Sequence, residues 1–150
     1  MAADVGSHES DCIFCKIVRG EIPAAKVLET ADAVAFLDVR PVNKGHVLLV
    51  PKVHHADLTE LPDVLAASVA SLLPRLCRAL MRATNAEGFH VIVNNGAAAG
   101  QTVFHGHWHL IPRHHGDPVH WPWPHAAYVG DELAQMRDAI EHALSSDADR

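Results

Sequence analysis

The pattern of apolar and polar positions divides the chain into short extended segments and one long helical segment. Short runs that are apolar or alternating, and that stop at turn-forming residues, are typical of β-strands. Five such runs are present, at 26–30, 33–37, 46–50, 89–93 and 105–112. Residues 30–32 are the predicted hairpin turn between the first two runs.

A long amphipathic helix is predicted between the third and fourth of these runs. Apolar residues recur there at intervals of three and four from residue 61 to residue 84. Pro62 fits the first turn of this helix, and Asp57 or Thr59 is expected to cap it. Pro74 lies inside the pattern and predicts a kink.

The length of 150 residues is typical of one domain. The polar residues 1–11 are expected to form a flexible N-terminus, followed by a single domain over 12–144. A second, shorter amphipathic helix is predicted over 131–144, and residues 145–150 are expected to fray.

The segment that follows the fifth predicted strand, 113–130, is rich in proline and histidine. Proline at this density excludes a helix or a central strand. Trp121 and Trp123 lie in this loop. They either cover a pocket, contact a partner chain, or pin the loop to its own core, and the sequence leaves these alternatives open.

Composition and charge narrow the class of protein. Hydrophobic residues make up 49% of the chain and charged residues 20%, as in ordinary globular proteins. The net charge is -6 and no run of Lys or Arg occurs, which argues against nucleic-acid binding. No apolar run is expected to reach membrane-spanning length, and no secretory signal is recognisable. Three cysteines, an odd number, favour the reducing cytoplasm.

The fifth predicted strand carries three histidines at alternate positions. Because side chains on a strand alternate between faces, His105, His107 and His109 are expected on one face, with Trp108 and Leu110 in the core. Evenly spaced imidazoles suit metal ligation, or phosphate chemistry in which one ring attacks and its neighbours manage charge. A solvated, histidine-rich edge strand is the plain alternative.

Cys12 and Cys15 form a CxxC pair, whose spacing lets two thiolates reach one zinc ion. Redox chemistry and simple burial are the competing interpretations. No second CxxC follows, so histidine ligands for a metal would have to come from distant strands.

Two further features favour a phosphate site. The loop 96–102 is made of small residues, whose glycines let backbone N–H groups approach an anion, and Thr102 adds a hydroxyl. This loop leads directly into the histidine segment. Asp38 closes the second predicted strand, where it either binds ribose hydroxyls or forms a turn before Arg40.

Taken in order, these motifs resemble those of the histidine-triad (HIT) family. They are Cys-Ile-Phe-Cys-Lys-Ile at 12–17, Gly-Glu-Ile-Pro at 20–23, Phe-Leu-Asp at 36–38, Gly-His-Val-Leu-Leu-Val-Pro-Lys at 45–52, Asn-Asn-Gly at 94–96, Gly-Gln-Thr-Val at 100–103 and His-Gly-His-Trp-His at 105–109. The resemblance implies an α+β fold, in which a five-stranded antiparallel sheet carries one long helix, here with a short C-terminal helix. It also implies a homodimer.

The resemblance further implies a hydrolase or transferase that acts at the α-phosphate of a purine nucleoside phosphoramidate or dinucleoside polyphosphate and yields an AMP-type product. His107 would be the nucleophile that forms a covalent nucleotidyl-histidine, which suits a neutral imidazole. His109 would contact the phosphate and assist the leaving group. The implied substrate contacts are Phe14, Ile17 and Phe36 for the base, Asp38 for the ribose, and Asn94, Gly100, Gln101 and Thr102 for the phosphate. No catalytic cofactor is implied.

Some bacterial members of the family hold a structural zinc ion with two cysteines and two histidines. The corresponding residues here are Cys12, Cys15, His54 and His105. All four are present, so the resemblance predicts a closed tetrahedral zinc site, in which His105 serves the metal instead of the reaction.

Three residues depart from the family pattern, and one of them, Thr102, stands where serine is common in the family. Two rival functions also remain. Gly106 and Trp108 stand where the family has aliphatic residues, and Gly106 either weakens strand packing or admits another segment. The His-Trp-Pro at 120–122 resembles a family loop that reaches the neighbouring subunit's site, although here a helix follows it. The rivals are a metal protein whose three histidines bind one ion, and a nucleotide-binding module without turnover.

Overall fold

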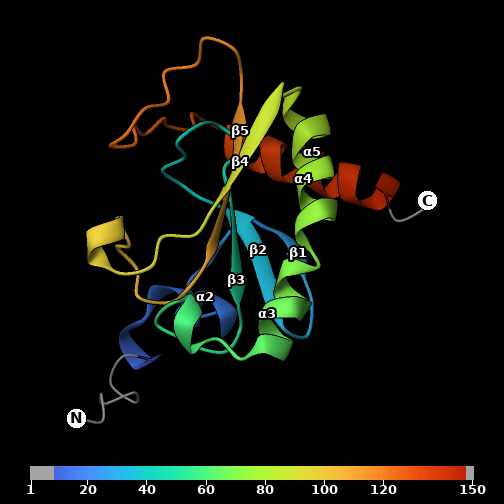
Figure 1. Ribbon diagram of the computed structural model, residues 1–150. Coiled ribbons are helices and arrows are strands. Elements are labelled where there is room, and N and C mark those ends of the chain that lie inside the picture. The colour runs from blue at the N-terminus through green and yellow to red at the C-terminus, as the bar shows by residue number, and fades with distance from the viewer. Residues whose placement is uncertain (1–8, 148–150) are drawn as a thin grey trace.

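The computed structural model describes residues 9–147, so the expectations for residues 1–8 and 148–150 lie outside it. Within that part of the chain, five strands form one antiparallel sheet in the order β1-β2-β3-β5-β4 (Figure 1). The strands are β1 (Lys26–Glu29), β2 (Ala33–Leu37), β3 (Val47–Pro51), β4 (Gly88–Ile92) and β5 (Trp108–Arg113). The α+β prediction of a five-stranded antiparallel sheet is confirmed.

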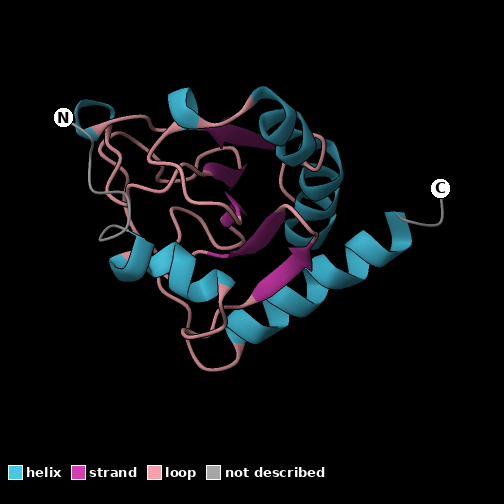
Figure 2. Ribbon diagram, turned by 90° about the horizontal axis from the view of Figure 1, so that it is seen from below, coloured by secondary structure: helices cyan, strands magenta, loops and turns pink. Residues whose placement is uncertain are grey.

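Helices cover the sheet unequally on its two faces. The face that packs the main core is covered by α3 (Asp63–Ala70), α4 (Leu73–Thr84) and α5 (Glu132–Asp147), with α5 lying beside α4 (Figure 2). The short α2 (Ile13–Val18) packs on the opposite face. Alternation within the strands produces this division: Leu37 and Leu49 enter the main core, whereas their neighbours Phe36 and Leu48 contact the α2 side.

The long helix predicted over 61–84 is two helices, because α3 ends at Ala70 and α4 begins at Leu73. Pro74 lies in the first turn of α4, where the missing N–H is not needed by the helix. The cap prediction is wrong. Asp57 accepts the Thr59 N–H and caps a short 3₁₀ helix, η1 (Leu58–Glu60), while Pro62 precedes α3 without a side-chain cap.

The segment 63–84 is long and apolar enough to cross a membrane, contrary to the expectation that no apolar run approaches that length. Length and composition alone are weak evidence for a membrane span, since core helices pass the same test. Here the fully buried Val69, Leu76 and Leu80 pack against the sheet. These three apolar positions are therefore used by the core, whereas Val64 at the start of the segment is 84% exposed.

The C-terminal helix continues to Asp147, so the expectation of fraying is wrong for residues 145–147. Ala143 and Leu144 are buried in the main core. The Asp147 carboxylate accepts hydrogen bonds from Arg78 at 2.7 Å and Arg82 at 2.9 Å. These ion pairs to α4 hold the last turn, which the apolar pattern alone does not reveal.

Candidate active site

The site lies on the sheet face that the long helices leave uncovered. Strand register places Phe36, Leu48 and His109 opposite one another on β2, β3 and β5. Trp108 and Leu110 point the other way and are buried in the main core, as predicted. The loops 93–107 and 114–131 lie on the side of the sheet away from α4 (Figure 1).

His105 and His107 precede β5 instead of lying on it, so the prediction that all three histidines share one strand is wrong. The Gly106 N–H donates to the His55 carbonyl at 2.7 Å, which draws this segment away from the sheet ladder. A Cβ at residue 106 would lie 3.3 Å from the carbonyl carbon of Asp57. Of the two interpretations of Gly106, the structure supports close approach of another segment.

A cavity of about 740 Å³ opens beside these histidines. It is lined by all of the residues predicted to be catalytic or to bind substrate: Phe14, Ile17, Phe36, Asp38, Asn94, Gly100, Gln101, Thr102, His107 and His109. These residues come from α2, β2, the loop before β5 and β5 itself, so the fold brings together residues that are far apart in the sequence.

The His107 ring is held by the backbone carbonyl of His105, two residues earlier in the chain. Its Nδ1 lies 2.7 Å from the His105 carbonyl oxygen, which only accepts hydrogen bonds, so the proton is on Nδ1. The other nitrogen, Nε2, therefore keeps its lone pair. Burial lowers the pKa of His107, which favours the neutral imidazole at physiological pH. A neutral ring with a fixed tautomer is what nucleophilic attack requires.

His109 has the opposite tautomer to His107. Its tautomer is fixed by His46, a residue that the sequence did not single out. The Val42 N–H donates to His46 Nδ1 at 3.1 Å, so the proton of His46 is on Nε2. That N–H donates to His109 Nδ1 at 3.0 Å, which leaves His109 with an N–H at Nε2. Burial lowers the pKa of His109 to about 3 and that of His46 well below its usual value. His107 thus offers a lone pair and His109 a donor.

Asp38 forms the predicted turn and also borders the cavity, and its binding of ribose hydroxyls stays a prediction. Its Oδ1 accepts the Arg40 N–H at 2.9 Å, which forms the turn, and its side chain also lines the cavity. Its Oδ2 lies 3.9 Å from His46 Nδ1. Burial raises the pKa of Asp38, opposed by the Arg40 backbone and by nearby His125 and His107.

The small-residue loop is held from within by Gln101. The Gln101 side chain accepts the Gly96 N–H at 2.7 Å and donates to Ala56 at 2.6 Å and Val103 at 3.0 Å. The backbone N–H of Gly100 donates to Ala97, and that of Gln101 to Gly96. The predicted phosphate loop includes Gly100, Gln101 and Thr102. Among residues 9–147, Thr102 has no hydrogen-bond partner for its hydroxyl or its backbone N–H, so both groups are available to a ligand in the cavity.

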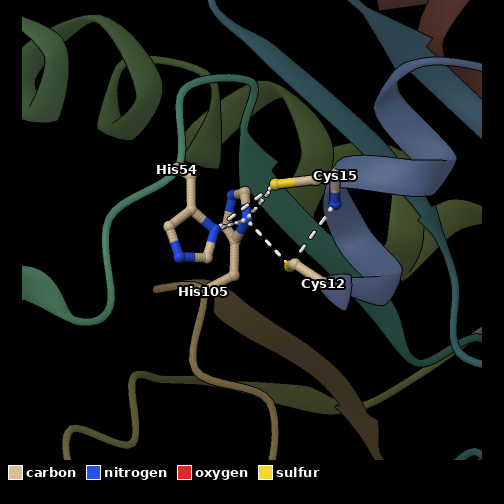
Figure 3. A group of neighbouring side chains, drawn as sticks. All are labelled: Cys12, Cys15, His54 and His105. Atoms are coloured by element: carbon tan, nitrogen blue, oxygen red, sulfur yellow. Dashed lines mark hydrogen bonds between the residues drawn. The ribbon is translucent and has the colours of Figure 1, made fainter. Parts of the chain in front are cut away.

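Cys12, Cys15, His54 and His105 converge on one point from α2, the loop after β3 and the segment before β5 (Figure 3). Their ligand atoms lie within 4.8 Å of one another. His54 Nδ1 is 3.2 Å from His105 Nδ1 and 3.3 Å from Cys15 Sγ, and His105 Nδ1 is 3.5 Å from both sulfurs. The edges of a tetrahedral zinc site built from these atoms are about 3.3–3.8 Å.

The surroundings of this cluster also suit a metal. His105 Nε2 donates to the Pro51 carbonyl at 2.7 Å, which turns the lone pair of Nδ1 toward the two sulfurs. Burial, aided by the Cys12 thiol, raises the pKa of Cys15 to about 12, and a divalent cation would offset that cost. His107 and His109 are not in the cluster, so the three triad histidines do not converge on one ion.

The cavity is also lined by Trp121 and Trp123. It is lined as well by His46, His125 and Arg40, three residues that the sequence did not place there. The Trp123 ring lies 5.0 Å from the His109 ring, and a Cβ on Gly100 would lie 2.7 Å from Trp121. Of the alternatives for this loop, the structure supports the one in which it covers a pocket of its own chain.

Comparisons with known proteins agree with this geometry. Residues 19–116 match the family model of the HIT domain. Adenylylsulfatase HINT3 of Arabidopsis thaliana is 44% identical, over 92% of this chain and 72% of that protein. Adenosine 5'-monophosphoramidase HNT1 of Candida albicans is 38% identical, over 94% and 95% of the two chains. A Zn-bound histidine triad family protein from Mycobacterium smegmatis superposes with a TM-score of 0.84 and 34% identity, covering 95% of this chain and 99% of that one.

Proposed function

The chain belongs to the histidine-triad (HIT) family, and we propose that it hydrolyses purine nucleoside phosphoramidates or dinucleoside polyphosphates at the α-phosphorus through a covalent nucleotidyl-His107 intermediate. The observation that carries the proposal is the His107 ring, whose Nδ1–H is fixed by the His105 carbonyl at 2.7 Å beside a cavity of about 740 Å³. Relatives with adenosine 5'-monophosphoramidase activity support a nucleotide hydrolase.

The nucleotide is proposed to lie along the cavity from α2 toward His109. Phe14 and Phe36 meet edge to face with ring centroids 5.7 Å apart, and with Ile17 they form an apolar surface suited to a purine. Asp38, at the end of β2, would accept hydrogen bonds from the ribose hydroxyls. The phosphate then reaches His107 and the Thr102 hydroxyl.

In the first step, His107 Nε2 attacks the α-phosphorus and the bond to the leaving group breaks. A leaving amine takes up one proton, which the Thr102 hydroxyl transfers as it recovers one from solvent. The His109 N–H donates to a phosphate oxygen as negative charge develops there. Asn94, also on the cavity wall, is a further candidate for a phosphate contact.

In the second step, water attacks the same phosphorus and the phosphorus–nitrogen bond to His107 breaks. The water gives one proton to solvent, so the two steps together consume one water molecule and release AMP and the leaving group. His107 returns to its neutral state with the proton still on Nδ1, because the His105 carbonyl holds it there.

We also propose that Cys12, Cys15, His54 and His105 hold a structural zinc ion. Four protein ligands leave no open position for substrate, so bound zinc would supply a closed structural link between α2 and the histidine segment. Within this cluster, the group that we assign to the reaction is the His105 backbone carbonyl, which fixes the proton of His107 on Nδ1. We expect one zinc per chain by mass spectrometry of the purified protein.

The family resemblance and the reduced cysteines further suggest a cytoplasmic homodimer. Cys12, Cys15 and Cys77 are all free thiols. Phe89 and Val91 on the edge strand β4 are exposed apolar residues available to a second copy. Light scattering coupled to size exclusion tests the dimer directly.

The function is tested by incubating the purified protein with adenosine 5'-phosphoramidate and with a diadenosine polyphosphate. We expect AMP release from at least one of them, unaffected by chelators on the timescale of the assay. Binding of AMP without any turnover would favour the nucleotide-binding module, and activity that depends on added metal would favour the metal protein.

A further inference from the structure

Cys12 and Cys15 lie side by side at the start of α2, with both sulfurs turned toward the same histidine (Figure 3). Each sulfur is 3.5 Å from His105 Nδ1, and the Cys12 sulfur also accepts the Cys15 N–H at 3.5 Å. The ligand atoms of the cluster all lie within 4.8 Å of one another, so the two sulfurs are no further apart than that. A small change in the first turn of α2 would therefore bring the sulfurs to bonding distance.

The two thiols differ in how far solvent reaches them. Cys12 precedes the helix with an extended backbone and is partly exposed, whereas Cys15 lies in the first turn and is 6% exposed. A solvent-accessible thiol beside a second thiol is typical of a cysteine pair that oxidants attack. Among residues 9–147, the remaining cysteine, Cys77, is buried in the main core and belongs to no such cluster.

The cysteine pair is connected to the cavity through Phe14, which lies between the two cysteines on α2. The Phe14 ring centroid is 4.9 Å from that of His107 and 5.7 Å from that of Phe36. Phe14 lines the cavity at the end that we assign to the base. Because Phe14 shares the first turn with both sulfurs, drawing the sulfurs together shifts the backbone that carries its ring.

We propose that Cys12 and Cys15 form an oxidisable pair, in which hydrogen peroxide produces a disulfide that releases the metal and weakens nucleotide binding at Phe14. This inference rests on the proposed function, since it needs zinc at the cluster and a nucleotide base beside Phe14. A disulfide lacks the thiolate charge that binds zinc, so only His54 and His105 would remain as ligands.

The oxidation proceeds in two steps. The Cys12 sulfur, which is the more accessible one, attacks peroxide, and the oxygen–oxygen bond breaks to give a sulfenic acid and one water molecule. The Cys15 sulfur then attacks the Cys12 sulfur and expels the second oxygen as water. Two thiols and one peroxide thus give one disulfide and two water molecules. Where zinc has displaced the thiol protons, the solvent supplies them.

The test treats the zinc-loaded protein with hydrogen peroxide and measures zinc release with a chromogenic chelator, cysteine pairing by peptide mapping, and the dissociation constant of AMP. We expect one zinc ion released for each Cys12–Cys15 disulfide. The dissociation constant of AMP should rise by about fivefold or more, because the base loses contact with the Phe14 ring. Dithiothreitol with added zinc should restore the thiols, the metal and the affinity.

Matched variants separate this role from general oxidative damage. Cys77→Ser should form the disulfide and release zinc as the wild type does. Cys12→Ser should form no disulfide, and peroxide should leave its affinity for AMP unchanged. The wild type and Cys77→Ser decide the question even if Cys12→Ser fails to fold.

Three results would overturn the proposal: zinc and both thiols that survive excess peroxide, a disulfide that leaves the affinity for AMP unchanged, or loss of affinity without the disulfide. An untreated protein that binds AMP but does not hydrolyse adenosine 5'-phosphoramidate would contradict the proposed function instead. The measurements of zinc, disulfide and affinity do not depend on turnover, so the two failures are distinguishable.

Discussion

His105 and His107 are two residues apart, and their rings are held in opposite ways. His105 donates from Nε2 to the Pro51 carbonyl at 2.7 Å and turns Nδ1 toward two thiols. His107 donates from Nδ1 to the His105 carbonyl at 2.7 Å and leaves Nε2 for the cavity. In each ring, the backbone carbonyl that takes one proton determines which nitrogen keeps a lone pair.

One short segment can therefore contribute to a structural site and to the proposed chemistry through the same residue, His105. The His105 side chain belongs to the Cys12, Cys15, His54 and His105 cluster of the proposed zinc site, whereas its backbone carbonyl accepts the Nδ1–H of the proposed nucleophile His107. The proposed zinc site and the proposed nucleophile are therefore adjacent, but the His107 side chain is not one of the four candidate metal ligands. Three substitutions and one pH series test whether the proposed zinc site and the proposed active site act independently.

The largest effect is expected for His107→Ala. Removing the attacking nitrogen should lower kcat/KM by about a thousandfold or more, as loss of a nucleophile does in other enzymes. Zinc content and melting temperature should stay close to the wild type, because His107 is outside the cluster. Metal analysis and thermal unfolding of the same sample check this. A parallel loss of zinc would contradict the separation of the two regions.

Cys15→Ser should have the converse effect. It removes a buried ligand, so we expect loss of the bound metal and a melting temperature lower by several degrees. Turnover at a temperature where the variant is still folded should remain within about tenfold of the wild type. Cys77→Ser is the matched control, since Cys77 is a buried thiol of the main core, far in sequence from the cluster. A loss of activity as large as that of His107→Ala would mean that the metal takes part in the reaction.

The pH dependence of stability sharpens the comparison on the cavity side. Burial lowers the pKa of His109 to about 3, below the ordinary value near 6.5, so between these values the unfolded chain binds a proton that the folded chain does not. Stability therefore rises with pH through this window and is lost as the pH falls. The slope for one such group approaches about 1.4 kcal/mol per pH unit.

Urea unfolding of the wild type and of His109→Gln at pH 5, 6 and 7.5 measures this contribution. The wild type should gain more stability than the variant between pH 5 and pH 6, because glutamine does not titrate. Metal release at low pH is common to both proteins and cancels in the difference. Equal slopes would mean that His109 is protonated in the folded state.

The smallest effect is expected for Gly106→Ala, between the two histidines. The added Cβ would lie 3.3 Å from the Asp57 carbonyl carbon, so Asp57 must move by a few tenths of an ångström. We expect a loss of about 1 kcal/mol in the free energy of unfolding. Gly88→Ala, where nothing lies within 4 Å of the added atom, is the control. If the two variants are equally stable, close packing does not explain Gly106.

The sequence predicted the features that depend on local pattern. Continuous apolar runs at 33–37 and 46–50 located two central strands, and alternation in the histidine segment placed Trp108 and Leu110 in the core. The motifs that resemble the family selected ten residues that line one cavity. The strand and core predictions succeed because periodicity is a property of short segments, whereas the roles of the ten residues in binding and catalysis stay predictions.

Features that depend on contacts between distant segments were missed or misjudged. Nothing local shows that His55 draws Gly106 out of the sheet, or that Arg78 and Arg82 hold Asp147 in a helix. The apolar pattern shows His46 only as the start of a strand. A buried polar residue there needs a partner, and that partner is His109. The position of the tryptophan loop likewise depends on distant segments, since the Ala126 N–H donates to the Pro41 carbonyl and the Gly45 N–H donates to the Tyr128 hydroxyl.

The central claim is that His107 carries the nucleotide during turnover. Wild-type protein mixed with adenosine 5'-phosphoramidate and quenched within milliseconds in alkali, which spares phosphorus–nitrogen bonds, should show an intact mass increased by one adenylyl group. Peptide analysis should assign the group to His107, and His107→Ala should show none. Hydrolysis at the full rate with no adduct at any quench time, or an adduct that persists in His107→Ala, would contradict the claim.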